Sequence, residues 1–137
     1  MTLKETLNSK DRFAYNTGAQ LTEIRKGYAK AELDVEEKHL NGADVCQGGV
    51  LFTLADLAFA AVTNGENILS LGVSNTITFL KSAHLNDHLI AECCEIHSHK
   101  KLPYCNIQIK NQKGELIAVM TGLAYRLSQE FHFSSYM

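Results

Sequence analysis

The sequence lacks the features that mark nucleic-acid-binding, secreted or repeat proteins. Its 13 Lys and Arg against 15 Asp and Glu leave a net charge of −2, which gives no electrostatic reason to expect a nucleic acid partner. Residues 1–10 are polar and of mixed charge, so they contain no apolar core of a signal peptide. Neither internal repeats nor low-complexity segments are present. We therefore expect one cytoplasmic globular domain over residues 1–137, with a hydrophobic fraction of 45% that is typical of soluble proteins.

Metal-binding patterns are also missing. No two cysteines form a C-x-x-C pair, and zinc sites need ligands in such spaced pairs. His97 and His99 alternate on an expected strand, but no third ligand is evident, and a solvated strand face explains them better. We expect no metal ion and four reduced, mostly buried thiols: Cys46, Cys93, Cys94 and Cys105.

Hydrophobic periodicity predicts one long apolar helix among about six strands. A short polar helix over 3–14, with Leu3, Leu7 and Phe13 loosely on one side, belongs to an N-terminal extension of about residues 1–18. Turns are expected at Lys26–Gly27 and at Gly114, which supplies a positive φ. Residues 128–137 have no period, and this tail is either frayed or docked on a partner. The strands are expected over Leu21–Arg25, Tyr28–Val35, Ser70–Lys81, Asp87–His99, Tyr104–Lys110 and Leu116–Arg126.

The expected helix over Gln47–Asn64 is apolar on almost every face, yet it carries Asp56 at its centre. A helix of this kind is buried, and a buried carboxylate without partners costs several kcal/mol or has a raised pKa. Asp56 and Asn64 also argue against a membrane span. One curved sheet can cover only one side of the helix, so a second subunit is expected on its other flank.

The start of this helix is a candidate oxyanion site. Gly48 and Gly49 would present free backbone N–H groups at the positive end of the helix dipole, with no side chain in the way. Asn41 can place an amide near the same point, and Asp56 is a candidate base or nucleophile with a raised pKa. Each residue also has a structural interpretation, as a helix start, a turn residue or a buried carboxylate.

The spacing of Gly48 and Asp56 indicates whether one chain or two chains would form the site. Gly48 and Asp56 are eight residues apart, so one helix separates them by roughly 12 Å of axial rise. They cannot both touch one reacting carbon. A two-fold dimer with its helices antiparallel would bring Asp56 of one subunit to Gly48 and Asn41 of the other, in two equal sites.

The stretch "HLNGADVCQGGVLFTLAD", residues 39–56, resembles the signature of the hotdog-fold acyl-CoA thioesterases of the phenylacetic-acid-degradation type, roughly H-x-N-x-x-G-x-x-H-G-G-x-x-x-x-L-x-D. The similarity spans about Leu21–Leu127. It implies an α+β hotdog fold, in which a curved antiparallel sheet of five to six strands wraps around one long helix. It also implies a homodimer, commonly a dimer of dimers (homotetramer), and no cofactor, since coenzyme A is part of the substrate.

The implied reaction is hydrolysis of an aryl- or medium acyl-CoA thioester between two subunits. Asn41 matches the asparagine near the carbonyl and the attacking water. Gly48 matches the glycine whose N–H polarises the carbonyl, and Asp56 the carboxylate that attacks or activates water. Gln47 stands where the family has histidine, and Lys81-Ser82-Ala83 where relatives often have arginine, proline and glycine.

Further substrate contacts are candidates only. Gln47 could line the pocket or cap the helix, and Gly49 shares the helix start. Ser74 and Thr76 could reach the site or face water. The lysines could bind the phosphates of CoA as point charges or could belong to solvated strand ends: Lys81, Lys100 and Lys101.

Two other functions fit the same fold. Related hotdog proteins dehydrate hydroxyacyl thioesters, but that chemistry needs a histidine, and Gln47 occupies the family's histidine position. A non-catalytic acyl-CoA binding or sensing protein is the other alternative. Asp56 argues against it, as does the absence of a separate DNA-binding segment. We expect a hydrolase without nucleic acid or membrane partners.

Overall fold

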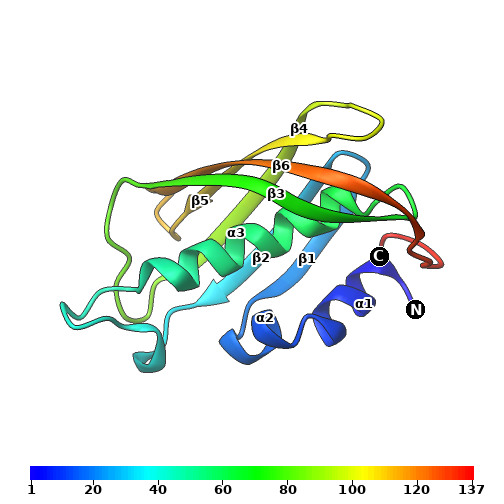
Figure 1. The fold of residues 1–137 in the computed structure, drawn as a ribbon. Coiled ribbons are helices and arrows are strands. Elements are labelled where there is room, and N and C mark those ends of the chain that lie inside the picture. Colours follow the sequence, from blue (N-terminus) through cyan, green and yellow to red (C-terminus); the bar gives the residue numbers. More distant parts are fainter.

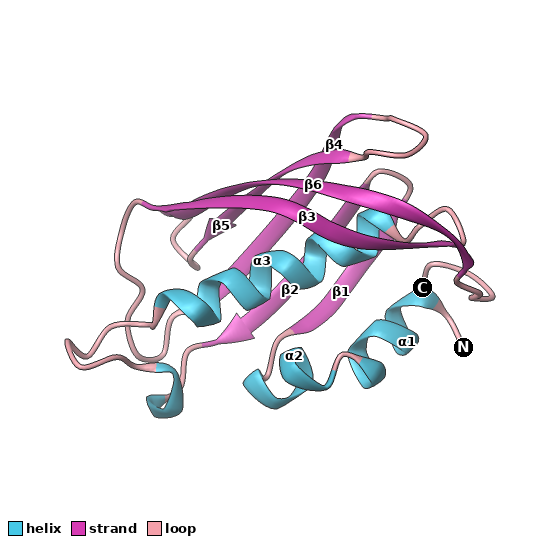
Figure 2. Cartoon of the chain, in the orientation of Figure 1, coloured by secondary structure: helices cyan, strands magenta, loops and turns pink.

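A single antiparallel sheet curves around one long helix in the computed structural model, which describes all 137 residues (Figure 1, Figure 2). The strands lie in the order β1-β2-β4-β5-β6-β3, so the predicted six strands and the predicted wrapped helix are confirmed. The helices are α1 (Leu3–Lys10), α2 (Arg12–Thr17), the 3₁₀ turn η1 (Glu37–His39) and α3 (Gly48–Thr63). The strands are β1 (Gln20–Arg25), β2 (Tyr28–Asp34), β3 (Ile68–Phe79), β4 (His88–His97), β5 (Tyr104–Lys110) and β6 (Leu116–Glu130).

The two faces of the sheet follow from its register. Directly paired residues lie on the same face, and successive residues of a strand point to opposite faces. Ala91 pairs with Ile109, which in turn pairs with Ala118, and all three are buried. The neighbouring row joins Gln108 and Val119 and lies on the outer face. Small and branched apolar residues on the inner face allow α3 to pack against the sheet.

Helix α3 is buried along most of its circumference. Gln47 caps its N-terminus and Asn64 its C-terminus, so the predicted limits at 47 and 64 are the two cap positions. Phe59 packs so closely on β6 that a Cβ on Gly122 would lie 2.8 Å from its ring. A less buried stripe follows helical spacing along the opposite side: Gly49, Phe52, Thr53, Asp56 and Ala60. This open stripe is the bare flank that the sequence predicts.

The single helix expected over 3–14 is wrong, because the chain forms two helices that meet at Asp11. Asp11 leaves helical geometry with a ψ of 86°, and its side chain accepts the N–H of Ala14 at 3.1 Å. A new helix therefore starts there, as Asp favours N-cap positions. Phe13, expected on the apolar side with Leu3, is 72% exposed.

The C-terminal tail docks on its own chain, which corrects both expected alternatives. Strand β6 continues to Glu130, and the N–H groups of Leu3 and Lys4 donate to the carbonyls of Ser135 and Tyr136 at 2.8 and 3.0 Å. Phe133 and Tyr136 pack against the core. The tail thus holds the start of α1.

The remaining expectations concern cysteines, histidines and turns. All four cysteines are free, and only Cys94 is exposed. His97 and His99 are exposed with ring centroids 6.2 Å apart, and no group of three or more His, Cys, Asp or Glu side chains is arranged to hold a metal ion. Gly27 and Gly114 have φ of 74° and 78°, as the two turns predict. None of the helices combines the length and apolar character needed to cross a bilayer.

Candidate active site

The N-terminus of α3 leaves one backbone donor free. The side-chain Oε1 of Gln47 accepts the N–H of Gly49 at 2.5 Å, and the Gln47 carbonyl accepts the N–H of Val50 at 3.0 Å. The N–H of Gly48 has no acceptor within the chain. Of the two interpretations of Gln47, pocket lining and helix cap, the structure shows the helix cap. Because the Gly49 N–H donates to Gln47, it is not available to a substrate. A free N–H at a helix N-terminus suits a carbonyl oxygen that gains negative charge.

Gly48 opens into a cleft of about 340 Å³. The cleft is formed by the loop before α3, the first turn of α3 and the loop after β3. Its lining residues are Asn41, Val45, Cys46, Gly48, Leu51, Phe79, Leu80, Lys81, Ser82 and Ala83. The structure thus brings together Asn41, Gly48 and Lys81 of the predicted set.

Asn41 is held by its own loop. Its Oδ1 accepts the N–H groups of Ala43 and Val45 at 2.8 and 3.3 Å, as in an Asx turn. Its Nδ2 donates to no group of the chain and remains available in the cleft. Cys46 fixes the end of the loop, because its N–H donates to the Ala83 carbonyl at 2.8 Å. Burial raises the pKa of the Cys46 thiol to about 11, so it lines the cleft as a neutral group.

Phe79 is a cleft residue that sequence reasoning missed. A Cβ built on Gly48 would lie 2.8 Å from Cζ of the Phe79 ring. A side chain at position 48 would therefore force the Phe79 ring or the first turn of α3 to shift. The alternation of Val73, Asn75, Ile77 and Phe79 was the available signal, since it places Phe79 on the face toward α3.

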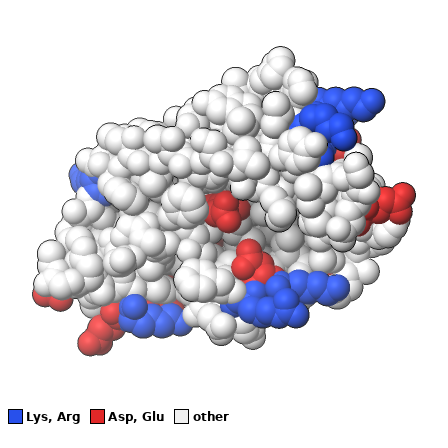
Figure 3. Space-filling model, in the orientation of Figure 1, with Lys and Arg blue, Asp and Glu red and all other residues white.

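Asp56 lies on the open stripe of α3, away from the cleft of its own chain. Its carboxylate has no hydrogen-bond partner, and burial, followed by the negative charge of Asp11, raises its pKa. Figure 3 shows two acidic patches near the middle of this face: uncharged atoms surround the upper one, and the lower one adjoins basic side chains. Since α3 is a continuous helix from 48 to 63, the axial separation of roughly 12 Å from Gly48 holds within one protomer.

Ser74 and Thr76 do not lie on the site's face of the sheet. Thr76 pairs with Thr121, which pairs with Asn106, and this row is on the outer face. The inner positions of β3 belong to Asn75 and Ile77. Their register partners are Gly122, which abuts Phe59, and the buried Met120. The alternation of residues along β3 already separates positions 74 and 76 from positions 75 and 77, but the hydroxyl groups of Ser74 and Thr76 had suggested a substrate contact.

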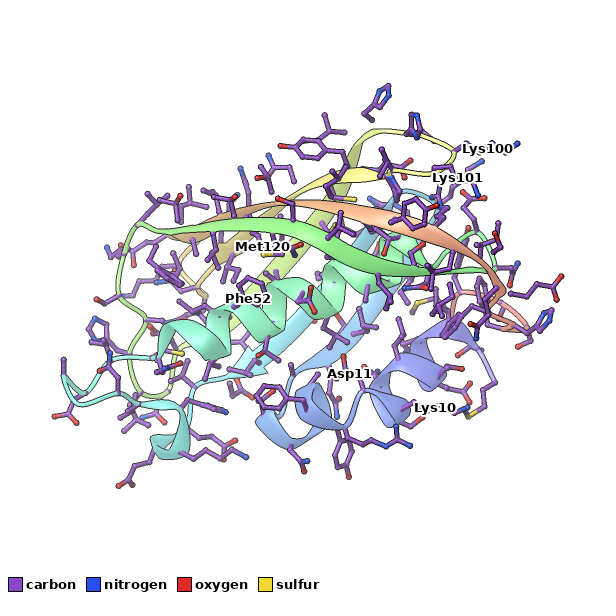
Figure 4. All side chains as sticks on the ribbon, viewed as in Figure 1. Lys10, Asp11, Phe52, Lys100, Lys101 and Met120 are labelled. Carbon is purple, nitrogen blue, oxygen red and sulfur yellow. The ribbon has the colours of Figure 1, made fainter.

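The three predicted lysines separate in space. Lys81 lies at the cleft and forms an ion pair with Glu115. Lys100 and Lys101 lie in the loop between β4 and β5, at the end of the molecule opposite the N-terminus of α3 (Figure 4). One protomer therefore does not bring them to Gly48.

Comparisons with known proteins identify the family of the chain. The model of the thioesterase superfamily matches residues 44–118, more than half of the chain. A protein of Archaeoglobus fulgidus is 36% identical over 129 residues, which cover 94% of this chain and 84% of that protein. The acyl-coenzyme A thioesterase PaaI of Escherichia coli is 32% identical over 117 residues, covering 85% of this chain and 84% of that protein.

The solved structure of the E. coli PaaI protein, from the phenylacetic acid degradation operon, covers 96% of this chain and 100% of its own, with a TM-score of 0.84 and 28% identity. The sheet, the central helix and the sequence match all lead to one assignment. The chain belongs to the thioesterase superfamily, has the hotdog fold of its PaaI-like members, and is a thioester hydrolase.

Proposed function

We propose that this enzyme hydrolyses acyl-CoA thioesters at two equal sites, each shared between two protomers of a dimer. The observation that carries the proposal is the free N–H of Gly48 in a cleft that also contains the free amide of Asn41. The similarity to a protein named acyl-coenzyme A thioesterase supports CoA as the leaving group.

Two features of the fold support a shared site. The open stripe of α3 carries Asp56 and Phe52 on a face that the sheet leaves uncovered. Strand β3, with 12 residues, forms one edge of the sheet and pairs only with β6. A long apolar edge strand invites pairing with another chain. A two-fold arrangement that covers both features would bring Asp56 to the partner's Gly48.

The reaction follows from these groups. Gly48 N–H and Asn41 Nδ2 bind the thioester carbonyl oxygen and stabilise the negative charge that it gains. Asp56 of the other protomer takes a proton from water while the water oxygen bonds to the carbonyl carbon. The tetrahedral intermediate then collapses, the C–S bond breaks, and CoA leaves with the electron pair of that bond as a thiolate. Direct attack by the Asp56 carboxylate, followed by hydrolysis of the anhydride, would use the same geometry.

The first test measures thiol release from a panel of aryl- and aliphatic-CoA thioesters. Asp56→Asn should lower kcat about 10³-fold while the protein stays folded and keeps its oligomeric state. Glu66→Gln, which removes an exposed carboxylate after α3, serves as the control. Undiminished turnover in Asp56→Asn would refute the assignment of the base.

The second test asks whether each site uses two chains. Asp56→Asn and Asn41→Ala are made separately, and their subunits are then mixed by co-expression. A mixed dimer has one site with both changes and one site with neither. Random mixing should therefore restore about a quarter of the wild-type activity. If both groups came from the same chain, every site would carry a change and no activity would return.

A further inference from the structure

A second carboxylate faces the open stripe of α3. It belongs to Asp11, at the junction of α1 and α2, in the part of the chain that precedes the family match at residue 44. Figure 4 shows the Asp11 side chain directed from this junction toward α3. Both short helices contact α3, and the charge of Asp11 is near enough to act on the Asp56 carboxyl.

The position of Asp11 is fixed by several contacts. Its N–H donates to the Leu7 carbonyl at 3.1 Å, and its Oδ1 accepts the N–H of Ala14 at 3.1 Å. The Asn8 side chain clamps α1 to β1, because it donates to the Leu21 carbonyl at 3.1 Å and accepts the Leu21 N–H at 2.8 Å. The junction is therefore anchored to the sheet as well as to α2.

No cation neutralises Asp11 by direct contact. Its sequence neighbours Lys10 and Arg12 are exposed, and the Arg12 guanidinium donates to the Lys10 carbonyl. Neither forms an ion pair with Asp11. Two like charges near one another in a partly buried place favour protonation of at least one of them.

The other elements packed against α3 contribute little charge toward Asp56. The inner face of β4 and β5 carries the buried residues Cys93 and Cys105, and burial raises the pKa of the Cys93 thiol. Glu95 of β4 is paired with Arg126 of β6, at 3.9 Å. Asp11 is thus the charged group that α1 and α2 present to Asp56.

We propose that Asp11 is a positioning residue of the active site, and that its negative charge makes Asp56 a stronger base toward the attacking water. The role rests on the proposed function of Asp56. Asp11 acts through Asp56, and the N-terminal extension thereby becomes part of the catalytic apparatus. Burial and the charge of Asp11 both raise the pKa of Asp56, in agreement with this arrangement.

The test uses the full-length oligomer and Asp11→Asn. Asparagine keeps the N-cap acceptor for Ala14 N–H but removes the charge, so α2 should persist. Loss of the charge makes the ionised form of Asp56 easier to reach, so the acidic limb of the kcat/KM profile should move to lower pH. Two pH units below the wild-type midpoint, the fraction of plateau activity should rise about threefold. The plateau itself should fall, because Asp56 has become a weaker base.

A second readout does not depend on turnover. The carbon-13 carboxyl signal of Asp56, assigned by its loss in Asp56→Asn, should titrate at lower pH in Asp11→Asn than in the wild type. Asp11→Ser also keeps a cap acceptor and should show the same shift in the Asp56 titration. It replaces Asp11→Asn if that variant folds poorly. Glu5→Gln removes an exposed carboxylate from α1 and should leave the titration unchanged.

The two proposals fail differently. An unshifted Asp56 titration and an unshifted acidic limb in both Asp11 variants would overturn the role of Asp11 and leave the proposed function intact. Full turnover in Asp56→Asn would overturn the proposed function itself. A general loss of activity at every pH, without a shifted limb, would also overturn the proposed role, because the charge of Asp11 would then not act on the titration of Asp56.

Discussion

The ring of Phe79 covers the Cα of Gly48, so that a Cβ added to Gly48 would lie 2.8 Å from the ring carbon Cζ. The close packing of this ring on the helix start, whose free N–H is proposed to bind the thioester carbonyl, therefore depends on the absence of a side chain at position 48. Phe79 belongs to β3 and Gly48 to α3, and their contact joins the edge of the sheet to the helix N-terminus.

Gly48→Ala should lower kcat/KM at least about tenfold, because the ring or the first turn of α3 must move and a small misplacement of an oxyanion donor is costly. The double variant with Phe79→Leu should recover part of this loss, since leucine leaves the Cβ more room. Steady-state kinetics on one acyl-CoA thioester measures both. Gly42→Ala is the matched control, because nothing lies within 4 Å of a Cβ at that position. Equal kinetics for Gly48→Ala and the wild type would contradict the steric argument.

Asp56 should cost stability at neutral pH while it supports activity. Burial and Asp11 raise its pKa in the folded state, so its contribution to the free energy of unfolding is complete below the unfolded pKa and is lost as the pH rises through the folded pKa. Asp56→Asn should therefore melt roughly 2 to 5 °C higher than the wild type at pH 7 to 8. The difference should shrink as the pH falls toward 4. Thermal unfolding monitored across this range checks both the sign and the window.

The periodicity of the chain predicted the fold because each pattern had a single solution. Alternation over 104–110 and 116–126 could only form an amphipathic hairpin, and the apolar run after Gln47 could only be a buried helix. The break at Asp11 was missed because a capping aspartate inside a short polar helix looks like any other polar residue. It is recognised only when its Oδ1 meets the Ala14 N–H.

The candidate site was only partly predictable for a related reason. Asn41, Gly48 and Asp56 stand at a spacing that carries chemical meaning by itself. The contact of Phe79 with Gly48 and the proposed role of Asp11 depend on segments that are distant in the sequence, and sequence spacing does not report such relationships. The hydroxyl chemistry of Ser74 and Thr76 suggested a substrate contact, whereas the period of the strand places both on the outer face of the sheet of their own protomer, so that contact stays a prediction.

A polar bridge on the outer face should make stability depend on pH near neutrality. The imidazole of His88 is 2.7 Å from a carboxylate oxygen of Asp34 and 2.8 Å from one of Glu32. Hydrogen bonds to Asp34 and then Glu32 raise the pKa of His88, so its stabilisation is present below the unfolded pKa of about 6.5 and is lost as the pH rises through the folded value.

His88→Gln should therefore destabilise the protein at pH 6 more than at pH 9. The effect should be small, at most about 0.5 kcal/mol, because the side chains of His88 and Asp34 are 38% and 77% exposed. Urea unfolding of the variant and the wild type at both pH values measures the difference. His132→Gln, at an exposed ion pair in the tail, is the control. A larger loss at pH 9 than at pH 6 would reverse the expected sign.

Arg126 should be the main support of the loop between β4 and β5. Only 6% of it is exposed, its Nη1 donates to the carbonyls of His99 and Lys100 at 2.7 and 3.3 Å, and its Nη2 lies 3.9 Å from a carboxylate oxygen of Glu95. Arg126→Met leaves the carbonyls of His99 and Lys100 and the Glu95 carboxylate without this donor, which should lower the free energy of unfolding by about 2 kcal/mol.

Arg126→Met should also loosen the loop between β4 and β5, in addition to lowering the free energy of unfolding. Amide hydrogen exchange over residues 98–102 should accelerate more than exchange in β5 and β6, because the guanidinium binds two carbonyls of this loop directly. Lys113→Ala, at an exposed turn, is the matched control for removing a positive charge and should change neither measurement. If the loop exchanged at wild-type rates in Arg126→Met, its order would have to come from the strand pairing on either side rather than from the guanidinium.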